Sequence, residues 1–240
     1  MTGEEALRYS RHMKLPAFGT EGQQKLKTAR VLIIGVGGLG SPAALYLAAA
    51  GVGTLGLMDG DTVSLSNLQR QVLHTTPDLG RAKTDSAFDK LQALNPTINI
   101  IATPHNLEPG NAGQAISDYD FIIDATDSID AKYLINDTCV EAGKPYSHGA
   151  LLRYEGYTFT YTPGHATLRD IFGPPPTADD EVLTCSRAGV FGAAAGIIGT
   201  IQAAEVIKHI VGAGQLLTDR LLTLNALTWQ FAQIDIEAQK

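Results

Sequence analysis

Short apolar runs alternate with amphipathic segments over the first 144 residues of the chain. Apolar or alternating runs that predict strands lie at residues 31–34, 54–58, 97–102 and 121–124. Segments with helical periodicity or helix end signals lie at residues 4–14, 20–27, 41–50, 83–94, 110–117 and 129–142. Strands that alternate with helices in this way are typical of a parallel sheet with right-handed crossovers.

The pattern changes after Pro145. Residues 146–161 are rich in aromatic residues and threonine and lack a helical period, and residues 221–236 predict two final strands. No internal repeat or linker divides the sequence. We therefore expect one α/β domain over residues 1–240, a Rossmann-like three-layer fold. Its parallel half, 1–144, is continued by the antiparallel strands of 145–240 in one mixed sheet.

Two further segments of the second half stand out. Residues 162–184 contain a run of three prolines and an acidic run, and their length predicts a mobile loop of functional importance. Residues 190–211 predict a helix that contains Gly192, Gly196 and Gly199. Because glycine weakens a helix, we expect another backbone to pass close to it, from this chain or from a second subunit.

Composition excludes several classes of protein. Hydrophobic residues make up 44% of the 240 residues and charged residues 18%, which is typical of a globular chain. The net charge of −7 argues against sequence-independent binding of nucleic acid. The longest apolar stretch, 188–204, is too short and too glycine-rich for a membrane span. We therefore expect no nucleic-acid or membrane partner. The two cysteines make no disulfide framework, which fits the reducing cytoplasm.

A glycine turn, GVGGLG at 35–40, follows one predicted strand and opens a predicted helix. Gly35 permits the tight turn, Gly37 lets the backbone approach a phosphate, and Gly40 allows close helix packing. The helix N-terminus then offers N–H groups to an anion. Asp59 lies nineteen residues after Gly40, at the end of the next apolar run, where it would bind ribose hydroxyls. The alternative role of Asp59 is to cap its strand.

The glycine turn does not separate NAD from ATP. Hydride transfer asks for no cluster of cations near the terminal phosphates, whereas nucleotidyl transfer needs them to meet the charge on the leaving pyrophosphate. Arg70 and Lys83 follow the ribose-binding strand, and Arg11 is a third candidate. Each alone also fits a solvated surface charge. Together they favour ATP, and an NAD-dependent oxidoreductase is the alternative.

The segments around these cations resemble the ThiF/MoeB/HesA family, the bacterial relatives of the ubiquitin-activating enzymes. The resemblance covers nearly the whole chain, in RYSRH (8–12), GVGGLGSPAALYLAAAGVGTL (35–55), MDGDTVSLSNLQRQ (58–71), DATDS (124–128), LTCSRAGV (183–190) and GTIQAAEVIK (199–208). It implies an enzyme, usually homodimeric, that uses ATP and Mg²⁺ to adenylate the C-terminal glycine of a ubiquitin-like sulfur carrier protein ending in Gly-Gly. Residues 44–55 look nearer to the thiamine branch than to the molybdopterin branch.

The resemblance also assigns roles to individual residues. It implies phosphate contacts from Gly38, Asn67, Arg70 and Lys83, a ribose contact from Asp59, Mg²⁺ binding by Asp127, and a contact from Arg11 to the partner subunit's nucleotide. Physical reasoning agrees for Asp127, because it follows a buried strand at the carboxyl edge of the sheet and Mg²⁺ prefers carboxylate and phosphate oxygens. The alternative is that Asp127 caps the following helix together with Ser128.

The implied reaction needs no protein nucleophile. The carrier's terminal carboxylate attacks the α-phosphate of ATP, and residues 1–144 would hold the nucleotide while residues 145–240 would hold the carrier and the dimer partner. Cys185 precedes a predicted helix beside Arg187, which would favour its thiolate; in some relatives the matching cysteine bonds to the carrier. Cys139 is expected in the core. A sulfur donor remains open as a further partner. A non-catalytic nucleotide-binding subunit and a peptide-modifying enzyme remain open as alternative functions.

The sequence departs from the family at its zinc site. Many relatives hold a structural zinc with two Cys-x-x-Cys pairs, but the positions of the first pair read Thr167 and Asp170. The second pair would follow Lys240, where this sequence stops. Four such ligands are needed for a closed site, so we expect no zinc. Ser128 also stands where the family has asparagine; neither change touches the catalytic cations.

Overall fold

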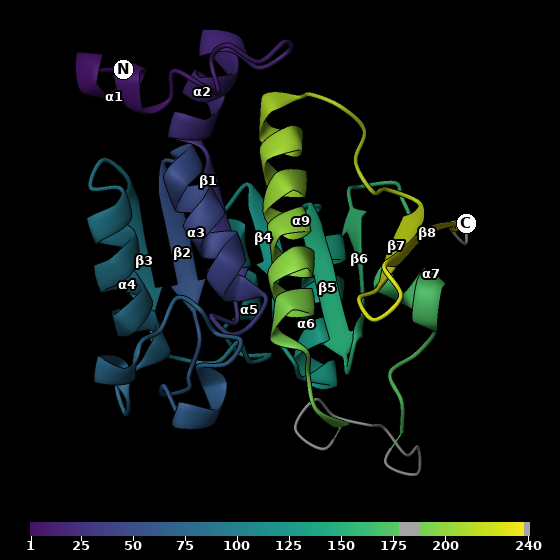
Figure 1. The fold of residues 1–240 in the computed structure, drawn as a ribbon. Helices are drawn as coiled ribbons and strands as arrows, with labels where there is room; N and C mark the ends of the chain where they lie inside the picture. Colours follow the sequence, from purple (N-terminus) through teal and green to yellow (C-terminus); the bar gives the residue numbers. More distant parts are fainter. Residues whose placement is uncertain (178–187, 238–240) are drawn as a thin grey trace.

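Eight strands form one mixed sheet in the computed structural model, which describes residues 1–177 and 188–237 (Figure 1). The spatial order is β3-β2-β1-β4-β5-β6-β7-β8. The strands are β1 (Arg30–Ile34), β2 (Thr54–Met58), β3 (Asn99–Thr103), β4 (Phe121–Asp124), β5 (Tyr146–Leu152), β6 (Glu155–Tyr161), β7 (Arg220–Asn225) and β8 (Gln230–Asp235).

The sheet changes direction at β5. Strands β3, β2, β1, β4 and β5 pair in parallel, and β5 to β8 pair as antiparallel neighbours. This arrangement confirms the expected α/β fold with a parallel half continued by antiparallel strands. Strand order reverses between β1 and β4, which is where ligands bind in open sheets of this kind.

Helices cover both faces of the sheet and so make three layers (Figure 1). One core lies beneath α3, α4 and α9, and the other beneath α5 and α6. Strand β1 feeds both, because successive side chains of a strand point to opposite faces. The helices are α1 (Gly3–Arg8), α2 (Gly19–Thr28), α3 (Gly40–Ala50), α4 (Lys83–Leu94), α5 (Ala112–Ser117), α6 (Ile129–Glu141), α7 (Leu168–Phe172) and α9 (Gly192–Val211), with short 3-10 turns η1 (Leu65–Asn67) and η2 (Thr76–Asp78).

One predicted helix end is wrong by several residues, and one helix was not predicted. The first helix ends at Arg8 instead of residue 14, because Tyr9 turns into the core, where its hydroxyl accepts a hydrogen bond from Asn95 Nδ2 at 2.8 Å. The expected loop 162–184 contains helix α7 in its described part. Its first turn is closed by reciprocal bonds between Thr167 and Asp170, a capping box.

Helix α9 has the close backbone contacts that its glycines predict. A Cβ on Gly199 would lie 2.2 Å from the Leu39 carbonyl oxygen, and one on Gly192 would lie 2.5 Å from the Gln69 carbonyl oxygen. These neighbours belong to the same chain, whereas Gly196 faces open space. The helix is long and apolar enough to cross a membrane by length and composition, but half of the tested stretch is buried against the protein. Packing against α3 and the sheet accounts for its apolar character.

Candidate active site

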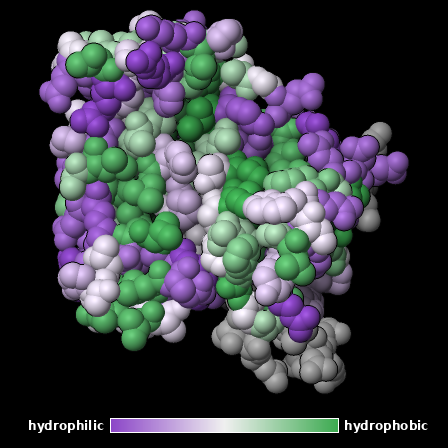
Figure 2. Space-filling view, in the orientation of Figure 1, coloured by the Kyte–Doolittle hydropathy of each residue, from purple (hydrophilic) through white to green (hydrophobic). Residues whose placement is uncertain are grey.

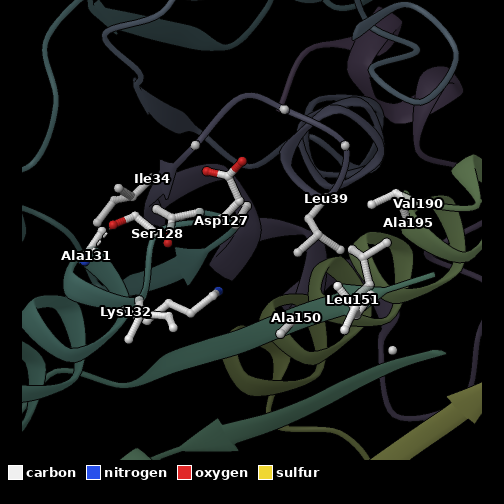
Figure 3. A pocket seen from close by; sticks show the side chains of 18 of the residues that line it. Ile34, Leu39, Asp127, Ser128, Ala131, Lys132, Ala150, Leu151, Val190 and Ala195 are labelled. Atoms are coloured by element: carbon white, nitrogen blue, oxygen red, sulfur yellow. Dashed lines mark hydrogen bonds between the residues drawn. The ribbon is translucent and has the colours of Figure 1, made fainter. Parts of the chain in front are cut away.

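A cavity of about 1190 Å³ opens at the carboxyl ends of β1, β2 and β4 and continues over β5 to β8 (Figure 3). It is lined by the glycine turn, by polar residues that follow β2 and β4, and by residues of the antiparallel strands. Of the residues that the sequence singles out, it includes Gly35, Gly37, Gly38, Asp59, Arg70, Lys83 and Asp127. Residues from five separate places in the sequence, 35–38, 59, 70, 83 and 127, therefore meet where the strand order reverses.

The glycine turn has no room for side chains at its two ends. Gly35 has a φ of 91°, and a Cβ there would lie 2.6 Å from the Ala125 carbonyl oxygen. A Cβ on Gly40 would lie 1.9 Å from the Gly35 carbonyl oxygen. A Cβ on Gly38 would lie 3.4 Å from Arg70 Cγ, a tight but tolerable contact. Gly35 and Gly40 thus allow the turn itself, while Gly37 and Gly38 leave backbone facing the cavity.

Asp59 holds the glycine turn in place. Its Oδ2 accepts a hydrogen bond from the Val36 N–H at 2.7 Å, and its Oδ1 accepts one from the Asp61 N–H at 2.9 Å. The capping role that the sequence leaves open is therefore present. Each carboxylate oxygen can accept a further bond, so a second partner on the cavity side is compatible with this geometry.

Two cations lie along the same wall of the cavity. Lys83, the first residue of α4, places its Nζ 2.7 Å from Asp61 Oδ2 and 3.7 Å from Asp59 Oδ2. Arg70 donates from Nη1 to the Ser66 carbonyl oxygen at 3.1 Å. Both residues line the cavity together with the glycine turn, and phosphate binding by them stays a prediction.

Ser128 takes the helix-capping role that was the alternative for Asp127, while Mg²⁺ binding by Asp127 stays a prediction. Ser128 is the N-cap of α6, and its side chain accepts a hydrogen bond from the Ala131 N–H at 3.4 Å. Asp127 is exposed and projects into the cavity (Figure 3). Helix capping therefore does not occupy the Asp127 carboxylate, whose oxygens suit a hard cation such as Mg²⁺.

Two other candidates lie outside the cavity lining and a third is outside the described residues, so the roles of all three stay predictions. Asn67 Oδ1 accepts a hydrogen bond from the Ser64 N–H at 3.2 Å, within the local cap of η1, and Asn67 is not among the cavity residues. Arg11 lies exposed in the turn after α1, outside the cavity lining. Cys185 falls outside the described residues 1–177 and 188–237.

A buried charged group that the sequence did not predict lies next to cavity residues Ala125 and Lys132. Asp124, at the end of β4, accepts a hydrogen bond from His148 Nδ1 at 2.7 Å and pairs with Lys132 Nζ at 3.2 Å. Lys132 also donates to the Gly149 carbonyl oxygen at 2.7 Å and lines the cavity (Figure 3). Burial favours the neutral acid, but Lys132, His148 and Thr126 together hold the pKa of Asp124 well below its usual value. The one sequence signal for this group was the position of Asp124 at the end of an apolar strand, where a carboxylate needs a buried partner.

The positions of the expected first zinc pair are joined by hydrogen bonds instead. Thr167 donates from its hydroxyl to Asp170 Oδ2 at 2.8 Å, and the Asp170 N–H donates back to Thr167 Oγ1 at 3.3 Å. This pair caps α7, whose Leu168 N–H also donates to Asn136 Oδ1 at 2.9 Å. In the part of the chain that the structure describes, no three His, Cys, Asp or Glu side chains form a metal-binding group.

Curated relatives match nearly the whole chain. The chain is 43% identical over 241 residues to the "Probable adenylyltransferase/sulfurtransferase MoeZ" of Mycobacterium tuberculosis, covering 98% of this chain and 61% of the relative. It is 43% identical to the "Probable molybdopterin-synthase adenylyltransferase" of Porphyra purpurea, covering 97% of this chain and 61% of that protein. It is 47% identical over 222 residues to "Adenylyltransferase and sulfurtransferase uba4" of Emericella nidulans, covering 89% of this chain and 46% of that protein. The chain therefore spans about three fifths or less of these relatives.

Solved structures share the fold. Escherichia coli MccB, crystallised with MccA-N7isoASN, superposes with a TM-score of 0.86 at 23% identity over 98% of this chain and 72% of MccB. PaaA superposes with a TM-score of 0.80 at 27% identity, over 99% of this chain and 75% of PaaA. The model of the ThiF family matches residues 9–240. With this match over almost the full length and relatives above 40% identity, the chain belongs to the ThiF family.

Proposed function

We propose that this protein adenylates the C-terminal carboxylate of a ubiquitin-like sulfur carrier protein, using ATP and releasing pyrophosphate. The observation that carries the proposal is the meeting of Arg70, Lys83 and Asp127 with the glycine turn in one cavity. Relatives named adenylyltransferases favour nucleotidyl transfer over the NAD-dependent alternative.

ATP fits the parallel end of the cavity. The phosphates would lie against the backbone of Gly37 and Gly38 at the start of α3, where N–H groups favour an anion. The ribose would approach Asp59, and Arg70 and Lys83 would face the terminal phosphates. Asp127 would hold Mg²⁺, which neutralises charge on the phosphate oxygens when bound.

The carrier's tail fits the antiparallel end of the cavity. There the lining from β5 to β8 includes small residues such as Ala150 and Gly156 and polar ones such as Asn225 and Gln230, beside larger apolar ones; Ala195 of α9 adds another small side chain. Small side chains leave space for a main chain to lie close to the sheet, as a Gly-Gly tail requires. Exposed apolar residues on the adjoining turns, Tyr154, Phe191, Leu227 and Trp229, offer a surface for the carrier's body.

The chemistry requires positioning and electrostatics only. A carboxylate oxygen of the carrier attacks the α-phosphorus of ATP, and the bond from that phosphorus to the bridging β-phosphate oxygen breaks. Charge then grows on the departing pyrophosphate, where Arg70 and Lys83 are already fixed to receive it. No protein thiol takes part in this step, so a covalent role of Cys185 would belong to a later one.

We also propose a homodimer, since family resemblance implies one and α9 supports it. Ala193, Gly196, Ile197 and Ala204 on α9 are exposed or half-buried, and Figure 2 shows hydrophobic residues over this helix. Arg11 would then contact the nucleotide of the other subunit. Sedimentation equilibrium would test the dimer, and a monomer at micromolar concentration would contradict it.

The decisive experiment is Mg²⁺-dependent exchange of labelled pyrophosphate into ATP. Two carriers ending in Gly-Gly, one molybdopterin-type and one thiamine-type, are compared with the same carriers lacking the last glycine. Exchange only with an intact carrier supports the proposal. We expect the molybdopterin-type carrier to be preferred, because one relative is named for molybdopterin synthase. Preference for the thiamine-type carrier would instead agree with the resemblance of residues 44–55 to the thiamine branch. ATP binding without exchange would instead favour a non-catalytic subunit or a peptide substrate, and NAD binding the oxidoreductase.

A further inference from the structure

A buried histidine, His74, contacts the glycine turn on the side that does not line the cavity. His74 is 4% exposed, and its Nε2 lies 2.9 Å from the Val36 carbonyl oxygen. Its Nδ1 lies 2.9 Å from Ser86 Oγ on α4. His74 is not among the cavity residues, so it touches the turn without facing the cavity.

The proton positions follow from the partners. A carbonyl oxygen can only accept, so Nε2 of His74 carries the proton and Nδ1 accepts from the Ser86 hydroxyl. Lys90 Nζ lies 3.1 Å from the same Ser86 oxygen. Burial, followed by the charges of Lys83 and Lys90, lowers the pKa of His74, against the opposing effect of the Val36 carbonyl and Asp78. The ring is therefore a neutral donor at neutral pH.

Val36 is held on both sides. Its N–H donates to Asp59 Oδ2 at 2.7 Å, and its carbonyl oxygen accepts from His74. In a trans peptide the C=O and the following N–H point in opposite directions. Fixing the Val36 carbonyl toward the protein interior therefore directs the Gly37 N–H away from His74, on the side where Gly37 lines the cavity.

We propose that His74 is a positioning residue that fixes the Val36–Gly37 peptide and so aims the Gly37 N–H at a phosphate of the bound nucleotide. The phosphate part rests on the proposed function; the fixed peptide does not. No group of His74 touches the nucleotide, so it acts only through the backbone.

Three variants separate this role from simple core filling. His74→Gln keeps an N–H donor at a similar reach, and His74→Met keeps length and burial but removes the donor. Gln23→Met is the matched control, because buried Gln23 donates from Nε2 to the Ala50 carbonyl oxygen at 2.8 Å, away from the cavity. Each Met variant removes one buried side-chain bond to a backbone carbonyl.

The first measurement is hydrogen–deuterium exchange of residues 35–41 in nucleotide-free protein. His74→Met should raise exchange about tenfold at the hydrogen-bonded amides of Val36, which donates to Asp59, and Ser41, which donates to the Gly37 carbonyl oxygen; His74→Gln should restore it to within about threefold, and Gln23→Met should leave it unchanged. Equal exchange in both Met variants would overturn the proposal. If His74→Met does not fold, Ser86→Ala frees the ring's other nitrogen and should raise exchange in the same amides; unchanged exchange there would overturn the proposal.

The second measurement is affinity for ATP and for adenosine. His74→Met should weaken ATP about tenfold and leave adenosine unchanged, because only the phosphates meet the turn. Equal weakening of both ligands would contradict the phosphate role. If the wild type itself binds no ATP, the proposed function fails, while the exchange data still decide whether His74 fixes the turn.

Discussion

The Lys83 ammonium lies 2.7 Å from the Asp61 carboxylate, at the edge of the cavity beside the glycine turn. Asp61 is largely exposed while the Lys83 side chain is buried, so the pair holds the cation in place without enclosing the carboxylate. Lys83 is thus placed before any anion arrives, which is the condition for electrostatic stabilisation of a leaving group.

Lys83→Ala and Arg70→Ala should each slow pyrophosphate exchange by about 10²–10³-fold. The reason is the loss of a fixed positive charge where the pyrophosphate leaves. Arg81→Ala removes a cation of the same region that does not line the cavity, and it should keep near-normal exchange. Near-normal exchange in either cavity variant would refute the leaving-group role.

Asp127→Asn should raise the Mg²⁺ concentration needed for half-maximal exchange, since a carboxylate ligand becomes an amide. It should leave the unfolding free energy nearly unchanged, because Asp127 does not cap α6. Ser128→Ala is the opposite case: it should cost about 1 kcal/mol of stability through loss of the cap and leave the Mg²⁺ requirement as it was. A magnesium titration and urea unfolding of both variants check this contrast.

Lys132→Met should reduce the unfolding free energy by about 3–5 kcal/mol, because Asp124 is fully buried and would lose its cationic partner. The same substitution at Lys25, whose ion pair with Glu21 has both side chains exposed, should cost less than about 1 kcal/mol. Denaturant unfolding measures both. Similar losses would show that Asp124 does not depend on Lys132.

Gly35→Ala should destabilise the protein by more than about 2 kcal/mol or prevent folding, given its positive φ and the 2.6 Å approach of the added Cβ to the Ala125 carbonyl oxygen. Gly113→Ala should instead stabilise it by up to about 0.5–1 kcal/mol, because that glycine lies in helix α5 with nothing within 4 Å of an added Cβ. Thermal unfolding of the two variants compares them. A stable Gly35→Ala protein would mean that the turn can relax.

Stability should fall as the pH drops below about 6.5. Burial lowers the pKa values of His74, His148 and His209, so the unfolded chain takes up protons in a range where the folded protein does not. Each histidine adds a slope of up to about 1.4 kcal/mol per pH unit between its folded pKa and its ordinary value. Above that range all three are neutral in both states and add no dependence. Unfolding curves from pH 8 to 5 measure the slope, and His209→Gln should make it shallower by one group.

Much of the fold could be predicted because its signals are local. The strand at 121–124 and the helix at 83–94 lie where the sequence places them, since apolar runs and the Asn95-Pro96 stop are strong markers. Helix α7 was missed because five residues between glycines and prolines carry little periodicity. The Thr167 and Asp170 spacing, read as a vacant zinc pair, was in fact the capping signal.

The residues of the candidate site likewise include some that the sequence could predict and some that it could not. Its glycine turn follows β1 and Asp127 follows β4, which are neighbours in the parallel half of the sheet, so topology alone brings them together. The bond of His74 to Val36 spans 38 positions, and that of His148 to Asp124 spans 24 positions. Such pairings depend on how helix α4 and strand β5 pack, and no sequence pattern reports them.

Strand β5 carries the change from parallel to antiparallel pairing, and it also separates two parts of the cavity lining. The proposed nucleotide contacts lie on one side of this strand and the proposed tail contacts on β5 and beyond. Mutations that accumulate in β6 to β8 would therefore retarget the enzyme to a new protein or peptide without disturbing adenylation. The two halves of such a domain can then evolve at different rates, slowly in the half that would bind the nucleotide and faster in the half that would bind the acceptor.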